Sequence, residues 1–105
     1  MRENYIKGSD VVCGVIGDPI AHTLSPLIHN TLSEKLEKRA VYVPFCVTKE
    51  NLKMAISGAH ALGIKGLNVT MPHKQEMFKH VVEVSPEAQA VGAINTLVYT
   101  ETGYI

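Results

Sequence analysis

The segment GLNVTMPHK, residues 66–74, carries two hydrogen-bonding side chains and an amine in an order that suits chemistry on a polar ligand. Side chains alternate between the two faces of a strand, so Asn68 and Thr70 share one face while Leu67 and Val69 point to the other. Open α/β sheets bind ligands at the carboxyl ends of their strands, where this segment ends. Asn68 and Thr70 are therefore candidates to face a ligand.

Lys74 follows Pro72, which breaks the strand, and lies near the start of the next predicted helical segment. The positive end of a helix disfavours a charged amine. That is the direction an amine needs to exchange protons near neutral pH, so Lys74 is a candidate acid–base group. The same residues also fit a plain turn with a solvated lysine, in which Asn68 and Thr70 form local hydrogen bonds. The segment alone leaves both interpretations open.

A second segment, GDPIAHTLSPLIHN at residues 17–30, predicts a helix without an acidic side chain in its first turn. Ser25 is a typical N-cap and Pro26 a typical first helical residue, but Ile28 at the N3 position forms no capping box. The first backbone N–H groups are therefore open to a negative partner, with the hydroxyls of Thr23 and Ser25 beside them. A ligand carboxylate is one candidate partner, and water is the other.

A third segment, VGAINT at residues 91–96, places Asn95 at the entrance of a predicted strand. By itself this asparagine fits an ordinary turn, and a ligand contact is the alternative.

Other signals for cofactors and metals fail on spacing. The residues 14–17 do not form a GxGxxG loop, and Asp18 would repel a pyrophosphate there. The five histidines form no HxH or HExxH pair and have no cysteine at ligand spacing, so we expect no metal site. They are His22, His29, His60, His73 and His80, of which His29 and His60 are expected on helix faces.

The composition describes an ordinary globular chain of 105 residues, with 46% hydrophobic residues and a formal net charge of zero. The balanced charge argues against nucleic acid, and no apolar run approaches the roughly 20 residues that cross a bilayer. The polar N-terminus lacks the apolar core of a secretion signal. Cys13 and Cys46 lie in apolar runs without CxxC spacing, so we expect buried, reduced thiols and a cytoplasmic protein.

The pattern of apolar residues predicts strands that alternate with helices, hence an α/β domain of three layers (αβα) with a mostly parallel, mixed sheet. Pro44 indicates that its strand lies at an edge or contains a bulge. The second helix is expected to begin at Thr48, to end at Gly63 and to bury Leu62 with the rest of its apolar face. The predicted elements are strands at 11–17, 41–47, 66–70 and 94–99, helices at 26–38, 48–62 and 74–82, a helix from Ser85, and a hairpin turn at 100–103.

Three segments together resemble the N-terminal substrate-binding domain of the shikimate dehydrogenases. They are GVIGDPIAHTLSP, GLNVTMPHK and GAINT, and the resemblance lies in their order and separations as well as in their residues. The resemblance runs from about Val12 to the end of the chain. Each motif alone is weak, whereas three in register are specific. The resemblance implies the substrate-binding part of a two-domain enzyme that reduces 3-dehydroshikimate to shikimate with NADPH, in aromatic amino acid biosynthesis.

The resemblance also implies roles for particular residues. The two hydroxyls of the family's Ser-x-Ser segment hold the substrate carboxylate, and the first serine is a threonine here, which leaves the preference between shikimate and quinate open. Lys74 matches the lysine that serves the reacting oxygen, as acid in reduction and base in oxidation. His73 occupies a variable position and receives no role. The matched substrate-binding residues are Thr23, Ser25, Asn68, Thr70 and Asn95.

The family pattern continues beyond this sequence. In the family, the hairpin at Tyr104 leads to an Asn-Thr-Asp segment, whose aspartate pairs with the lysine, and then to a dinucleotide-binding domain. We therefore expect residues 1–105 to be a substrate-binding domain incomplete at its C-terminus, inactive alone because hydride transfer needs a nicotinamide site. NADP would bind to the absent domain, and the surface that this domain covers would allow a homodimer. The alternatives are a stand-alone module that binds shikimate or quinate without turnover, and an interaction domain with a vestigial pocket.

Overall fold

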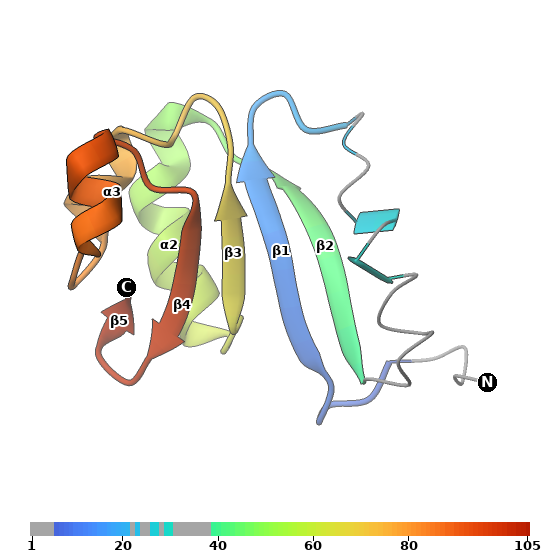
Figure 1. Cartoon of the computed structure of the whole chain (residues 1–105). Coiled ribbons are helices and arrows are strands. Elements are labelled where there is room, and N and C mark those ends of the chain that lie inside the picture. The colour runs from blue at the N-terminus through green and yellow to red at the C-terminus, as the bar shows by residue number, and fades with distance from the viewer. Residues whose placement is uncertain (1–5, 22, 24–25, 28, 31–38) are drawn as a thin grey trace.

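The computed structural model describes residues 6–105 except 22, 24–25, 28 and 31–38. Within these residues, five strands form one sheet in the order β2-β1-β3-β4-β5 (Figure 1). β2, β1 and β3 are parallel, whereas β4 and β5 are antiparallel to their neighbours. The strands are β1 Val11–Gly17, β2 Ala40–Cys46, β3 Gly66–Val69, β4 Thr96–Thr100 and β5 Gly103–Tyr104. The predicted α/β class, mixed sheet and terminal hairpin are confirmed, and Pro44 lies on the edge strand β2 in unbroken register with β1.

A helical segment crosses one face of the sheet. It begins with a 3-10 turn, η1 Lys49–Asn51, and continues as α2 Leu52–Ala61. Gly63 ends it with a φ of 75°, a conformation that glycine adopts without strain, as predicted. The expectation that Leu62 is buried is wrong: this residue follows the last helical residue and is 81% exposed, although it lines an open apolar pocket with Phe45 and Ile56.

The other helices are short. The segment predicted as a helix over 74–82 is a 3-10 helix, η2 Glu76–His80, which begins two residues after Lys74. α3 Pro86–Val91 begins at Ser85, whose side chain accepts a 3.1 Å hydrogen bond from the N–H of Ala88. The helix predicted over 26–38 lies mostly outside the described residues, and its described residues 26–27 and 29–30 are helical.

The two faces of the sheet have different roles because side chains alternate along each strand. Leu67 and Val69 of β3 point to the face that α2 covers, where they join the apolar core with Leu52 and Ile56 of α2. Asn68 lies between them in the strand and therefore points to the opposite face. In Figure 1, α2 lies along β3 and β4 on its own side of the sheet.

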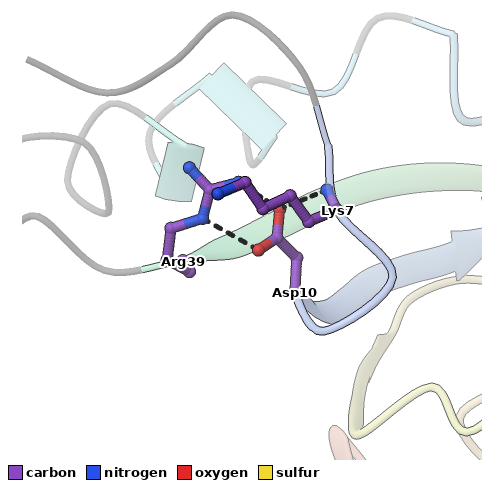
Figure 2. A network of polar contacts seen from close by, with 3 residues as sticks. All are labelled: Lys7, Asp10 and Arg39. Carbon is purple, nitrogen blue, oxygen red and sulfur yellow. Dashed lines mark hydrogen bonds and ion pairs between the residues drawn. The ribbon is translucent and has the colours of Figure 1, made fainter.

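A network of polar contacts fastens the amino ends of β1 and β2 (Figure 2). The carboxylate of Asp10, only 1% exposed, accepts two hydrogen bonds from the Arg39 guanidinium, at 2.9 and 3.0 Å, and one from the backbone N–H of Lys7 at 3.0 Å. A two-pronged guanidinium–carboxylate pair fixes both distance and orientation. It anchors the amino-terminal edge of the sheet, opposite to the carboxyl-terminal edge, where Asn68 lies in β3 and Thr70 follows it.

The two cysteines are free, but they are less buried than expected. Cys13 is half-buried and Cys46 is exposed, with its thiol 3.6 Å from Oδ1 of Asp18. For Cys46 the reason is the position of β2 at the edge of the sheet, which leaves part of its apolar run facing solvent. Burial raises the pKa of Cys13; the pKa of Cys46 is raised by desolvation and next by the neighbouring carboxylate of Asp18.

Candidate functional site

The loops that follow β1, β2 and β3 meet at the carboxyl-terminal edge of the sheet, where all three parallel strands end. Parallel α/β sheets bind ligands at this edge. Three backbone hydrogen bonds of 3.0 Å join the loops: Thr70 N–H to Ile16 O, Asp18 N–H to Met71 O, and Val47 N–H to Gly17 O. The segment after β3 is thereby held against the loop that follows β1.

Gly17 brings β1 and the end of β3 into close contact. A Cβ at this position would overlap the methyl group of Thr70 and would lie 3.1 Å from the carbonyl oxygen of Met71. The missing side chain therefore lets Thr70 pack directly on the end of β1. The peptide bonds before Pro19 and Pro72, in the two adjoining turns, are both cis.

Asn68 is the centre of a chain of polar side chains that crosses the sheet. Its Oδ1 accepts a 2.6 Å hydrogen bond from the hydroxyl of Tyr42 in β2, and its Nδ2 donates to Oγ1 of Thr96 in β4 at 3.2 Å. Asn68 retains one N–H hydrogen and one oxygen lone pair for a further partner. A half-buried amide with this spare capacity suits a ligand that carries hydroxyl groups.

Lys74 and Asn95 are brought together by backbone contacts. The N–H of Ile94 donates to the carbonyl of Lys74 at 2.9 Å, and the N–H of Val69 donates to the carbonyl of Asn95 at 2.7 Å. Both segments therefore lie at the carboxyl end of β3. Lys74 is half-buried and Asn95 is exposed, and no ion pair with the Lys74 amine occurs among the described residues.

His73, which received no role from the sequence, is a structural residue of this loop. Its side chain has 0% exposure, and Nε2 lies 2.5 Å from the carbonyl oxygen of Val47. Since a carbonyl only accepts, Nε2 carries the proton, and Nδ1 is buried with no hydrogen-bond partner among the described residues. His73 thus ties the segment after β3 to the segment after β2, one residue before Lys74.

The residues predicted to hold a carboxylate are only partly described. Thr23 is half-buried on the loop after β1, and its N–H donates to the carbonyl of Ile20 at 3.2 Å. Ser25 lies outside the described residues. The structure therefore brings four of the six predicted site residues to the carboxyl end of β3, and it places Thr23 on the adjoining loop. These four are Asn68, Thr70, Lys74 and Asn95.

The sequence analysis missed two residues of this site, Tyr42 and Thr96. Both contact Asn68 from other strands, so only the strand order reveals them. Thr96 follows Asn95 directly, and its register opposite Asn68 needs an antiparallel pairing that the segment does not specify. An open cavity of about 400 Å³ adjoins Thr96 and is lined further by Ile94, Val98 and Ile105.

The chemistry of this edge is that of neutral donors and acceptors plus one amine. Such a set can bind a small polyol and exchange a proton with it. No group of three metal-ligating side chains occurs within the part of the chain that the structure describes. The helices described are also too short and too polar to cross a membrane.

This fold and this edge define an α/β domain that presents a polar, lysine-containing site at the carboxyl ends of its parallel strands. Residues 15–97 match the family described as the shikimate dehydrogenase substrate binding domain, and the chain belongs to this family.

Relatives of known function agree with this assignment. A shikimate dehydrogenase (NADP(+)) from Gloeothece citriformis is 46% identical over 99 residues, which cover 94% of this chain and 34% of that protein. A crystal structure of a shikimate dehydrogenase in complex with NADP+ has a TM-score of 0.92 at 44% identity, over 96% of this chain and 35% of the other. A Listeria monocytogenes shikimate 5-dehydrogenase in complex with shikimate and NAD has a TM-score of 0.91 at 38% identity, over 99% and 36% of the two chains. The chain spans about a third of the length of the curated relatives it matches.

Proposed function

We propose that this chain is the substrate-binding portion of an NADP-dependent shikimate dehydrogenase, and that it binds shikimate and 3-dehydroshikimate. The observation that carries the proposal is the convergence of Asn68, Thr70, Lys74 and Asn95 at the carboxyl end of β3, in a chain of this family. Relatives named for this activity, one of them in complex with shikimate, support the choice of ligand.

In this proposal the ligand ring lies over the carboxyl end of β3. Asn68, Thr70 and Asn95 contact its hydroxyl groups, and the hydroxyls of Thr23 and Ser25 hold its carboxylate beside the open helix start. The amine of Lys74 gives a proton to the reacting oxygen during reduction and takes it back during oxidation. A cis-diol acid matches this set better than an apolar ligand, because Asn68 keeps unsatisfied hydrogen-bonding capacity.

The described residues do not fit the dinucleotide. The loop after β1 presents the exposed Asp18 where a dinucleotide-binding turn presents glycines, and a carboxylate there repels a pyrophosphate. NADP would therefore bind outside these 105 residues, in a second domain of a longer protein, and residues 1–105 would act as the substrate-binding domain. We expect no turnover by this chain alone. The two free thiols support a cytoplasmic location.

The test is titration of shikimate into the 105-residue chain, followed by calorimetry and by two-dimensional NMR. We expect saturable binding that moves the backbone signals of Asn68, Thr70 and Lys74. Asn68→Ala should weaken it, and cyclohexanecarboxylate, which has the acid but no hydroxyls, should bind poorly. Quinate, titrated in parallel, measures the preference between the two polyols.

If neither the heat of binding nor the NMR signals change at millimolar shikimate, the binding free energy is weaker than about −4 kcal/mol. That result would contradict the proposal and favour a vestigial pocket. If the chain binds shikimate but the full-length protein encoded by the gene has no dehydrogenase activity, the chain is instead a stand-alone binding module.

A further inference from the structure

Tyr42 is held at three points, two of them from the adjacent helical residues His29 and Asn30 and the third from Asn68 in β3. The side-chain amide of Asn30 accepts a 2.7 Å hydrogen bond from the N–H of Tyr42 and donates a 2.8 Å bond to its carbonyl. The ring of His29 stacks on the Tyr42 ring, with centroids 4.3 Å apart and planes inclined by 17°. The Tyr42 hydroxyl donates to Asn68.

The backbone contacts explain why Tyr42 is well fixed. β2 is the edge strand of the sheet in the described part of the chain, so no described strand pairs with the outward N–H and C=O groups of Tyr42. Asn30 takes the place of that missing strand. With only 8% of its side chain exposed, Tyr42 reaches across β1 to Asn68 and does not lie open to a ligand itself.

The hydroxyl of Tyr42 also decides which way the Asn68 amide points. A phenol that donates to Oδ1 requires the oxygen on the Tyr42 side and the NH₂ group on the Thr96 side. One hydrogen of that group goes to Thr96, and the other remains free. In this orientation the free N–H of Asn68 lies on the Thr96 side and its free oxygen lone pair lies on the Tyr42 side, whereas a flipped amide would exchange these two positions.

We propose that Tyr42 is a positioning residue for the substrate: its hydroxyl fixes the orientation of the Asn68 amide, so that the free N–H on the Thr96 side donates to a substrate hydroxyl oxygen, and its ring and backbone link that amide to the helical residues His29 and Asn30. This inference rests on the proposed function. It adds a residue that touches no substrate but sets the orientation of one that does.

The test is a double-mutant cycle on shikimate affinity in the full-length protein that carries this domain, with Tyr42→Phe and Asn68→Ala alone and combined. Tyr42→Phe should raise Kd about fivefold, the effect of one lost hydrogen bond. In the Asn68→Ala background the same change should raise Kd less than about twofold, because the group that Tyr42 orients is gone. The NMR signals of the Asn68 side-chain NH₂ should shift in Tyr42→Phe without ligand.

Tyr104→Phe is the matched control. Its hydroxyl donates a 2.7 Å hydrogen bond to the carbonyl of Ile64, which precedes the amino end of β3, whereas Asn68 lies near the carboxyl end of that strand; the Tyr104 side chain is fully buried. This variant removes the same atom from a similar environment, and it should lower stability while leaving Kd unchanged.

The outcomes separate the two ideas. A wild-type protein that does not bind shikimate overturns the proposed function and this inference with it. Wild-type binding, with an equal loss from Tyr42→Phe in both backgrounds or with no loss, overturns the inference alone. If Tyr42→Phe does not fold, the fallback variant carries 3-fluorotyrosine at position 42, which has nearly the same shape and is a stronger hydrogen-bond donor. This variant should shift the NMR signals of the Asn68 side-chain NH₂. Unchanged signals would overturn the inference.

Discussion

The main-chain carbonyl of Lys74 accepts a 2.9 Å hydrogen bond from the N–H of Ile94. The contact fixes the loop around Lys74 beside the segment that contains Asn95, and it uses no side-chain atom of either residue. The neighbouring His73 anchors the same loop through its buried ring. The backbone of Lys74 and the ring of His73 thus hold this loop in place. The Lys74 amine takes no part in these contacts, so its removal should leave the loop where it is.

Lys74→Ala in the full-length protein should therefore lower turnover without unfolding the domain. We expect kcat to fall by at least about 100-fold, the contribution of a positioned acid–base group. The free energy of unfolding should change by less than about 0.5 kcal/mol, since the backbone bond to Ile94 remains. Steady-state kinetics and urea denaturation measure both. A loss confined to KM would show that Lys74 only binds.

Ser25→Ala should weaken shikimate binding by about 1.5–3 kcal/mol, the range for a hydrogen bond to a charged group. The matched control is Ser85→Ala, because both serines precede a proline and Ser85 caps α3 through Ala88. The control should cost about 1 kcal/mol of stability and leave affinity unchanged. Calorimetric titration of both folded variants makes the comparison, and equal dissociation constants would contradict the carboxylate assignment.

Gly17→Ala should destabilise the domain by about 1–3 kcal/mol, because the added methyl overlaps that of Thr70. Thr70→Ser keeps the hydroxyl and removes the obstructing methyl, so the double variant should regain part of the loss. Thermal unfolding of the three variants measures this coupling. If the two changes add independently, the packing of Thr70 on Gly17 does not set the geometry of this edge.

Arg39→Met should cost about 1.5–3 kcal/mol of stability, because it removes the two charge-assisted hydrogen bonds from the guanidinium to the buried carboxylate of Asp10. Adding Asp10→Asn removes that carboxylate charge and should recover part of the loss. Denaturant titrations of the single and double variants provide the values. Shikimate affinity of the folded protein should stay constant, since this pair lies at the other edge of the sheet.

Alkaline pH should destabilise the domain through Tyr104. Burial, and next the charge that Tyr99 would carry, raises the pKa of Tyr104 to about 12. An unfolded tyrosine titrates near 10, so the stabilisation is fully present below about pH 10 and is lost as pH rises towards 12, by about 1.4 kcal/mol per pH unit.

Denaturant titrations at intervals from pH 9 to 12 measure this slope. Tyr104→Phe should flatten it, leaving the contribution of Tyr42, whose pKa burial also raises. An identical slope in that variant would show that Tyr104 does not titrate with unfolding.

The sequence by itself determined the local elements and the segments that meet at the site. Glycines, prolines and caps act over a few residues, so the turn at Gly63, the start at Ser85 and the strand carrying Asn68 follow from neighbouring residues. Alternation along one strand likewise placed Asn68 and Thr70 on one face.

Only the tertiary structure decided which residues of different strands meet. Tyr42 and Asn68 are 26 residues apart, and their contact depends on the order β2-β1-β3, which no local signal encodes. The same strand order leaves Cys46 at an exposed edge, and the packing of the loops after β2 and β3 buries His73. Burial and cross-strand contacts arise from pairing between segments that are distant in the sequence. The free energy of that pairing depends on all the strands that form the sheet, so no single segment of the sequence specifies it.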